Sequence, residues 1–499
     1  MLQARIGSES YCVSGLETYF YPFRKQMIGI DQTFMTAYGK KEILYADWMA
    51  SGRLFRPIEN KLTDVYGPFV ANTHTESNVT GTTMTLAYKH ARDIIKSHVH
   101  ADECDVLLTG GSGMTAMVNK LQRLLGLKVP NHLREKLLLP EEERPIIFVT
   151  HMEHHSNQLS WMETIGDVVI VEPDQQGLVD PEQLERKLRG YQNRKFKIGA
   201  FTACSNVTGV QTPYHALSRK MHEYGGLCFI DFSASAPYVD INMHPAHPLE
   251  KLDAIYFSPH KFLGGPGASG VLIVDSRLIS SPVPDHPGGG TVLWSNPWGG
   301  KRYNWDMESR EDGGTPGFLQ TIRTALCITL KEKMGTQQMQ HREWEMLDIL
   351  LPKLGRIHGL HVLDGHISER KGIVSFYLEN IHYNLMVRLL NDRYGIQTRG
   401  GCSCAGTFGH YLFNLNQTLS KQITDTIDTG DLSYKPGWVR ISLHPIMTNS
   451  EIEYIIHAIR DIMQNIEEYR KDYVYHPGNN EFHHVKSVSN PPVEQWFSW

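Results

Sequence analysis

Apolar runs alternate with amphipathic segments from residue 105 to residue 274. The runs are short and rich in Val, Ile and Phe, as buried strands are, and most of the segments between them carry apolar residues at helical spacing. The expected strands are 105–109, 146–150, 167–171, 198–202, 227–230, 254–257 and 270–274, and the expected helices are 114–125, 156–165, 181–188 and 214–224. This order predicts an α/β fold with a mainly parallel, seven-stranded sheet that has helices on both faces.

A different pattern follows. A long helix over 315–334 is expected to leave the sheet, and the remainder mixes strands and helices as a smaller α+β domain does. Its expected elements are helices 340–354, 385–394 and 450–469 and strands 372–378 and 439–443. Because 499 residues exceed one ordinary core, we expect four parts. They are an N-terminal arm (1–40), a large domain (41–330), a small domain (331–475) and an extended C-terminal tail (476–499).

Three stretches interrupt the pattern. Residues 72–81 are dense in Thr, Asn, Ser and His and predict a polar loop, which is either solvated or part of a site. Residues 127–145 combine prolines with many charges and predict a surface insertion. Residues 282–314 are rich in Gly, Pro and Trp and too long for an idle connection, so we expect them to be functional or interfacial.

Charge and cysteine content narrow the function classes. A net charge of -5 and a pI near 6.6 give no electrostatic case for binding nucleic acid or an anionic membrane. No apolar run reaches the roughly 18 residues of a membrane span and no basic, apolar leader opens the chain, so we expect a cytoplasmic protein. The seven cysteines are thinly spread and are expected to be reduced thiols rather than a disulfide framework.

One lysine stands where an apolar strand stops. Strand 254–257 delivers Ser258, His260 and Lys261 to its carboxyl end, and glycines follow. Ligand crevices of open α/β sheets lie at that end of the strands, and a lysine partly withdrawn from water there can attack an aldehyde as a free amine. A lone lysine after a strand is more often a surface residue, so the prediction depends on the groups at the neighbouring strand ends.

Four other strand ends offer complementary groups. The small residues of 109–115 let backbone N–H groups approach a phosphate at a helix N-terminus, although a plain tight turn is an equally good interpretation. His154 suits stacking on a planar ring; adjacent histidines face apart on a helix, so His154 and His155 would not chelate one metal ion. Asn206 offers an amide. Asp231 closes an apolar strand, which is costly for a carboxylate without a cationic partner.

These groups match the needs of pyridoxal 5′-phosphate. That cofactor requires an anion site, a lysine for the Schiff base, and a carboxylate that keeps the pyridine nitrogen protonated. Binding of NAD would need a Gly-x-Gly-x-x-Gly fingerprint between a strand and a helix, with an acidic residue about 20 positions later, and none of the expected strand-to-helix turns carries it.

The motifs EHHSN, SNVTG, SPHK and GGTPG follow in this order. With them the chain, from about residue 45 to about residue 462, resembles the class V aminotransferase family of fold-type I pyridoxal-phosphate enzymes, in its cysteine desulfurase and selenocysteine lyase branch. The resemblance implies that Lys261 forms the Schiff base, His154 stacks on the ring, Asn206 lies beside the phenolic oxygen and Asp231 pairs with the ring nitrogen. It implies that the cofactor phosphate is bound by Ser112, Gly113, Ser258 and His260. It also implies a homodimer with shared active sites, in which Thr315 reaches the phosphate of the other protomer.

Two further motifs concern the substrate. Arg399 opens RGGCSCA, and Arg440 lies in WVRIS; both resemble the family's arginines for the α-carboxylate of an amino acid, which a guanidinium binds through paired hydrogen bonds. Cys404 lies five residues beyond Arg399, the family spacing of the desulfurase nucleophile. The loop also resembles that of molybdenum cofactor sulfurases. The resemblance thus implies sulfur transfer from L-cysteine to Cys404, release of alanine, and delivery to a sulfur-acceptor protein.

Two alternatives stay open: an aminotransferase or a selenocysteine or cysteine lyase that does not need Cys404, and a non-catalytic sulfur-carrier or interaction protein. Cys402 is accessory or structural; a metal pair is disfavoured because Cys-x-Cys supplies only two of the four ligands of a structural zinc site. The chain departs from many desulfurases at Ala234, where they carry a glutamine. The reaction outcome is therefore less constrained than the cofactor.

Overall fold

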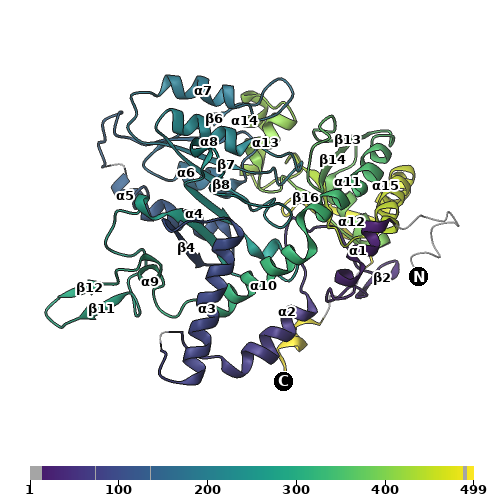
Figure 1. Cartoon of the computed structure of the whole chain (residues 1–499). Coiled ribbons are helices and arrows are strands. Elements are labelled where there is room, and N and C mark those ends of the chain that lie inside the picture. The colour runs from purple at the N-terminus through teal and green to yellow at the C-terminus, as the bar shows by residue number, and fades with distance from the viewer. Residues whose placement is uncertain (1–13, 74, 135, 487–491) are drawn as a thin grey trace.

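The computed structural model describes residues 14–73, 75–134, 136–486 and 492–499. Its central sheet has the order β4-β10-β9-β8-β7-β5-β6 (Figure 1). All of its strands run in one direction except β10, which is antiparallel to both neighbours. The predicted seven-stranded, mainly parallel sheet is confirmed. Its strands are β4 Asp105–Gly110, β5 Ile146–Thr150, β6 Asp167–Val171, β7 Lys197–Thr202, β8 Leu227–Asp231, β9 Ala254–Phe257 and β10 Gly270–Asp275, and the helices around it are α3 Val79–His98, α4 Met114–Leu124, α6 His155–Met162, α7 Pro181–Gly190, α8 Tyr214–Glu223 and α10 Phe318–Met334.

Both faces of this sheet are buried. Successive strand residues point to opposite faces, so Phe148 of β5 belongs to one apolar core and Val149 to another. The first core includes residues of α7, α8 and the C-terminal part, and the second lies under α4 and α6. Burial on both sides explains why these strands are continuous apolar runs in the sequence.

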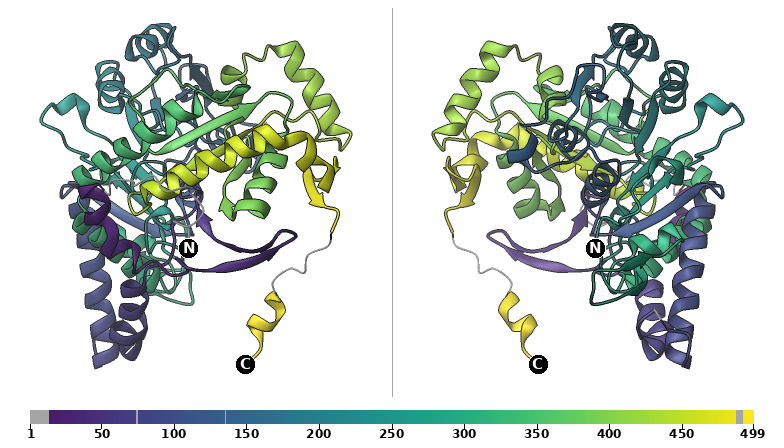
Figure 2. Two further views of the ribbon diagram at one scale, coloured as in Figure 1. Left: turned by 90° about the vertical axis from the view of Figure 1, so that its right-hand side faces the viewer. Right: turned by 90° about the vertical axis from the view of Figure 1, so that its left-hand side faces the viewer.

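The C-terminal part is built on a second, antiparallel sheet of order β13-β14-β17-β16. α15 packs against α11 and α12 and leads towards a hairpin formed by residues 473–484 (Figure 2). From the other end of the chain, α1 (Gly15–Arg24) packs on α11, and β3 (Leu44–Tyr45) pairs with β15 (Ile396–Gln397). The elements are β13 Leu360–Val362, β14 Ile373–Leu378, β16 Arg399–Gly401 and β17 Trp438–Ser442, with α11 Thr336–Leu354, α12 Tyr383–Tyr394, α13 Gly406–Leu412, α14 Gln417–Asp428 and α15 Asn449–Tyr469.

The predicted extended tail from residue 476 is wrong over its first part. β18 (Tyr473–His476) and β19 (Glu481–His484) form an antiparallel hairpin. It is anchored on α12, because Asn384 Nδ2 donates to the Asn480 carbonyl at 2.5 Å and Asn480 Nδ2 donates to the Tyr383 hydroxyl at 2.6 Å. These side-chain contacts join segments about a hundred residues apart and leave no periodic signal.

The irregular stretches take different forms. The polar run 72–81 is not a loop throughout: α3 begins at Val79, where Asn78 Oδ1 accepts from Gly81 N at 2.8 Å. Within 282–314, β11 (Val292–Ser295) and β12 (Lys301–Tyr303) form a hairpin that projects from the body (Figure 1). No helix among the described residues is both long and apolar enough to cross a bilayer.

A tight backbone crossing supports the turn that carries Lys261. Gly52 N donates to the His260 carbonyl at 2.8 Å, and a Cβ on Gly52 would overlap the Phe262 carbonyl oxygen. We expect Gly52→Ala to lower the free energy of unfolding by about 1–3 kcal/mol, the usual cost of overpacking. Urea denaturation measures it, with Gly190→Ala as the matched control, because a Cβ there meets nothing within 4 Å. Equal stability of the two variants would contradict the expectation.

Candidate active site

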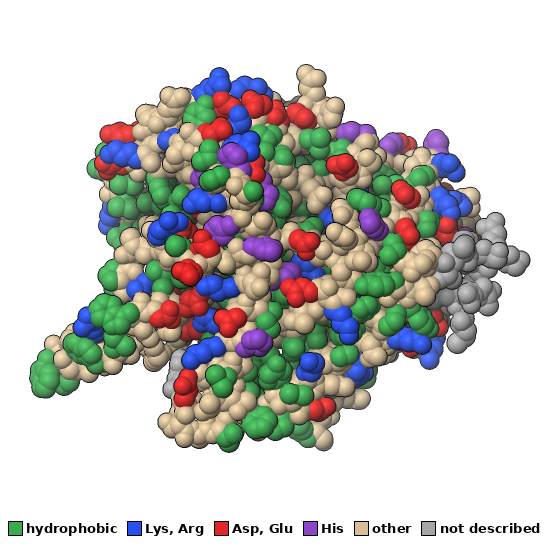
Figure 3. Space-filling model, viewed as in Figure 1, with side chains coloured by type: hydrophobic (Ala, Val, Ile, Leu, Met, Phe, Trp, Pro, Cys, Tyr) green, Lys and Arg blue, Asp and Glu red, His purple; other side chains and the backbone are tan. Residues whose placement is uncertain are grey.

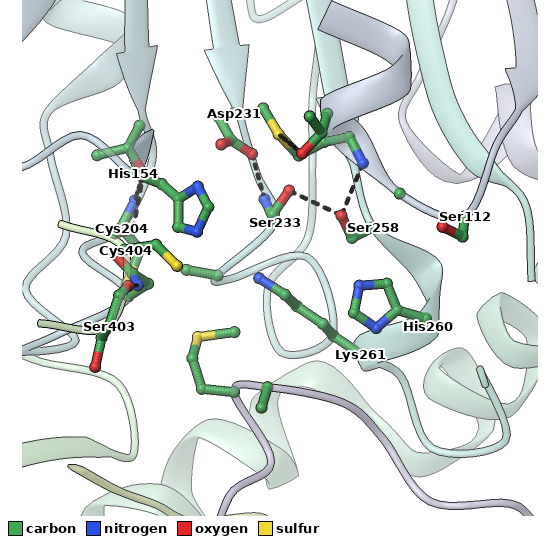
Figure 4. A pocket seen from close by; sticks show the side chains of 18 of the residues that line it. Ser112, His154, Cys204, Asp231, Ser233, Ser258, His260, Lys261, Ser403 and Cys404 are labelled. Atoms are coloured by element: carbon green, nitrogen blue, oxygen red, sulfur yellow. Dashed lines mark hydrogen bonds between the residues drawn. The ribbon is translucent and has the colours of Figure 1, made fainter. Parts of the chain in front are cut away.

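A cavity of about 280 Å³ lies at the carboxyl ends of the central strands, beside the C-terminal part (Figure 4). Parallel strands bring their carboxyl ends to one edge of a sheet, so residues far apart in the sequence converge there. Thr315 is exposed and lies outside the cavity. All the other predicted site residues line it: Ser112, Gly113, His154, Asn206, Asp231, Ser258, His260, Lys261, Arg399, Cys404 and Arg440.

Lys261 ends a short helical turn, Pro259–Lys261, that follows β9. Its side chain extends into the cavity between His260 and the loop that carries Cys404 (Figure 4). Burial lowers the pKa of Lys261 to about 8; Asp231 opposes this shift, and the two cavity arginines add to it. A neutral amine is therefore far more available here than at an ordinary exposed lysine.

Asp231 is the last residue of β8 and is 3% exposed. Its Oδ1 accepts a hydrogen bond from Ser233 N at 2.9 Å. Burial raises the pKa of Asp231, while Ser233 and the nearby Lys261 oppose the shift without cancelling it. A buried carboxylate in this state is suited to a cationic partner such as a protonated ring nitrogen.

His154 and Asn206 lie at neighbouring strand ends. His154 caps α6: its Nδ1 accepts from Ser156 N at 3.1 Å, so the proton is on Nε2. Burial lowers the pKa of His154 to about 3, and the charge of Lys261 adds to this effect, so the ring is neutral. Asn206 Nδ2 donates to the Ser403 carbonyl at 2.7 Å, whereas its buried Oδ1 has no hydrogen-bond partner among the described residues.

The turn between β4 and α4 forms an open cradle. Gly113 caps α4, Met114 N donates to Ser258 Oγ at 2.9 Å, and a Cβ on Gly113 would lie only 3.0 Å from the same oxygen. Burial lowers the pKa of His260 to about 4, so its ring is neutral beside the cradle. An anion site at this helix N-terminus, the Lys261 amine and the Asp231 carboxylate together fit pyridoxal 5′-phosphate.

The two arginines differ in how they are held. Arg440 is buried; its Nη2 donates to Asp47 Oδ1 at 3.0 Å and its Nη1 donates to the Asn206 carbonyl at 3.1 Å. Arg399 is exposed, and its guanidinium makes no hydrogen bond or ion pair with any residue that the structure describes. Of the two guanidinium groups, that of Arg399 is therefore the one free to bind a carboxylate, next to a fixed second positive charge.

The loop between β16 and α13 separates its two cysteines. Cys404 is exposed and lines the cavity, whereas Cys402 is partly buried and packs against the large apolar core. Of this pair, Cys404 therefore shares the cavity with Lys261 and Cys402 does not.

Sequence reasoning missed the cavity-lining Met49 and Cys204, and the buried Glu153 near the ends of the same strands. Glu153 is fully buried, accepts from Thr202 N at 2.9 Å and from Asn157 Nδ2 at 2.8 Å, and so ties the ends of β5 and β7 together. Burial raises its pKa to about 7. A carboxylate just after a buried strand was the available signal. Ala234 lies with Met49 and Cys204 in a small apolar cluster, and all three line the cavity.

Comparisons with known proteins identify a family for this chain. A family model described as "Aminotransferase class-V" matches residues 44–455. A probable cysteine desulfurase of Halalkalibacterium halodurans is 27% identical over 372 residues, which cover 73% of this chain and 84% of that protein. One of Staphylococcus aureus is 24% identical over 371 residues, with coverage of 73% and 84%.

Solved structures share the fold. The cysteine desulfurase of Thermococcus onnurineus superposes with a TM-score of 0.71 at 20% identity, over 91% of this chain and 99% of that chain. A cysteine desulfurase of Escherichia coli gives a TM-score of 0.69 at 20% identity, over 90% and 98%.

Proposed function

Because the chain belongs to the aminotransferase class-V family, we propose that it is a pyridoxal-phosphate enzyme that transfers sulfur from L-cysteine to Cys404 and releases L-alanine. The observation that carries the proposal is that Cys404 opens onto the same cavity as Lys261, Arg399 and Arg440. The relatives named as probable cysteine desulfurases support the same reaction.

The cavity residues divide the work between cofactor and substrate. Asp231, His154, Lys261 and the cradle at Gly113 would hold the cofactor, which when bound withdraws electrons from Cα of the amino acid. Arg399 binds the substrate carboxylate, and the fixed charge of Arg440 orients it. The Lys261 amine, with its lowered pKa, takes the proton from Cα and later returns one.

Cys404 is the sulfur acceptor. Its thiolate attacks the sulfur of the bound L-cysteine, so an S–S bond forms while the Cβ–S bond breaks. The electron pair of the broken bond stays with the carbon fragment, which then takes up a proton. The balance is L-cysteine plus the Cys404 thiol giving L-alanine plus a Cys404 persulfide.

The test is to incubate the purified protein with L-cysteine and to measure alanine, sulfide and pyruvate separately. We expect alanine from the wild type and at least about tenfold slower alanine formation by Cys404→Ala, a loss of about 1.4 kcal/mol or more in transition-state stabilisation. Cys402→Ala is the matched control and should keep the wild-type rate. Undiminished alanine formation by Cys404→Ala, pyruvate as the main product, or no turnover by the wild type would each overturn the proposal.

A homodimer completes the proposal. Thr315 is exposed and outside its own cavity, as expected of a residue that reaches the phosphate of the other protomer. The projecting β11–β12 hairpin carries hydrophobic side chains at its surface (Figure 3), among them Trp298, which is 88% exposed. Such a surface is typical of an interface. The exposed Cys404 would pass its sulfur to an acceptor protein, in the cytoplasm, where thiols stay reduced.

A further inference from the structure

The loop that carries Cys404 is held in a costly backbone conformation. Ser403 and Cys404 both have left-handed backbone angles, with φ of +51° and +56°. Two consecutive residues with side chains rarely adopt this conformation, and they persist in it only where surrounding contacts enforce it. The position of the Cys404 thiol over the cavity therefore depends on the contacts that hold the loop.

Several hydrogen bonds hold the loop that carries Cys404. Ser403 accepts at its carbonyl from Asn206 Nδ2 at 2.7 Å and at its Oγ from Trp438 Nε1 at 3.1 Å. His155 contacts the loop twice, in both cases just C-terminal to the thiol-bearing Cα of Cys404. Its backbone N–H donates to the Cys404 carbonyl at 2.7 Å, and its ring Nε2 accepts from Gly406 N at 2.8 Å.

The ring of His155 is suited to this role. Gly406 is the first residue of α13, so its N–H has no acceptor within the helix and the imidazole supplies one. An Nε2 that accepts must be unprotonated, and burial, together with the charge of Lys435, lowers the pKa of His155 and keeps the ring neutral. Gly406 leaves little spare room, because a Cβ there would lie 3.0 Å from His155 Nε2.

We infer that His155 is a positioning residue that fixes the Cys404 thiol beside the substrate carboxylate site. The inference rests on the proposed function, and it gives separate work to two adjacent histidines. His154 turns its ring to the cavity, while His155 holds the nucleophile loop from the same helix start. Movement of the loop would then separate Cys404 from Arg399 without altering the fold of either sheet.

The test compares two alkylating reagents on the intact protein. Iodoacetate carries a carboxylate that the cavity arginines attract, whereas iodoacetamide is neutral, so their rate ratio at Cys404, measured on the modified peptide by mass spectrometry, reports the position of the thiol. We expect a wild-type ratio about fivefold above that of free cysteine, as for a partly exposed charge pair. His155→Leu should reduce it to the free-cysteine value, and His155→Gln, which keeps an acceptor for Gly406 N, should retain most of it.

A second pair of variants tests the inference independently, in case His155→Leu does not fold. Gly406→Ala crowds the ring from the other side and should also lower the ratio, whereas Gly409→Ala should not, since its Cβ would meet the Trp438 ring at an ordinary 3.4 Å. In turnover, His155→Leu should lower kcat for alanine with KM for L-cysteine nearly unchanged. A wild-type ratio in both His155→Leu and Gly406→Ala would overturn the inference. Because labelling needs no turnover, this outcome is distinct from undiminished alanine formation by Cys404→Ala, which would sink the proposed function alone.

Discussion

Lys261→Ala is expected to abolish the conversion of L-cysteine to alanine, with kcat reduced by about 10²–10⁴-fold or more, the range for losing a general acid–base residue. The variant loses both the amine that anchors the cofactor and the base that serves Cα. Its fold should survive, because the lowered pKa of Lys261 shows that burying its charge costs rather than contributes stability. Alanine formation and the visible absorption of the purified protein measure the effect.

The control for this variant identifies the lysine that is covalently bound to the cofactor. After reduction with borohydride, the wild type should carry the cofactor mass on the peptide that contains Lys261, and Lys261→Ala should carry none. The surface variant Lys187→Ala should match the wild type. A reduced cofactor on another lysine, or undiminished turnover by Lys261→Ala, would refute the assignment. The pKa of about 8 for Lys261 also predicts a pH dependence. The rate at which the protein binds added cofactor covalently should rise about tenfold per pH unit below pH 8 and level off above it.

The convergence of these groups was predictable because a parallel sheet fixes where strand ends meet. Asp231 and Lys261 are thirty residues apart in the sequence, yet Asp231 ends β8 and Lys261 ends the short turn after β9, and these strands are neighbours. Two apolar runs of the right length, each followed by a polar residue, were sufficient to predict that both side chains face one cavity. Helix bounds near the sheet followed from apolar periodicity in the same way.

Other features of the site left no local pattern. The ion pair between Asp47 and Arg440 joins residues 393 positions apart, and the hydrogen bond from Asn206 to Ser403 spans 197. Such pairs depend on how the C-terminal sheet packs on the large one, which neither composition nor periodicity records. The start of α3 was missed for a different reason: its capping Asn78 lies inside a polar run that resembles a loop.

Asp231→Asn is expected to change activity and stability in opposite directions. Turnover should fall by about 10²–10⁴-fold, the range for loss of a general acid–base group, because an amide cannot keep the ring nitrogen of the cofactor protonated. The cofactor-free protein should become more stable near neutral pH by about 1–3 kcal/mol, since the variant no longer buries a carboxylate without a full partner. The bond from Ser233 N survives, because an amide oxygen accepts it equally well.

The pH dependence follows from the direction of the shift. Burial raises the pKa of Asp231 above its unfolded value, so the folded state binds more protons and loses stability as the pH rises from the unfolded pKa to the folded one. The stability gain of Asp231→Asn should therefore shrink as the pH falls towards about 4, the ordinary pKa of an aspartate. Urea unfolding of cofactor-free protein at several pH values measures it.

Asp253 supplies the matched contrast at the opposite end of the sheet. Although buried, it accepts from His222 Nε2 and Cys228 N, each at 2.8 Å, and these partners, with Lys251, outweigh burial and lower its pKa. Its ionised form therefore stabilises the fold above its unfolded pKa, so Asp253→Asn should destabilise the protein at neutral pH. Loss of stability in both variants would show that Asp231 is a structural carboxylate like Asp253, with no cofactor nitrogen to serve.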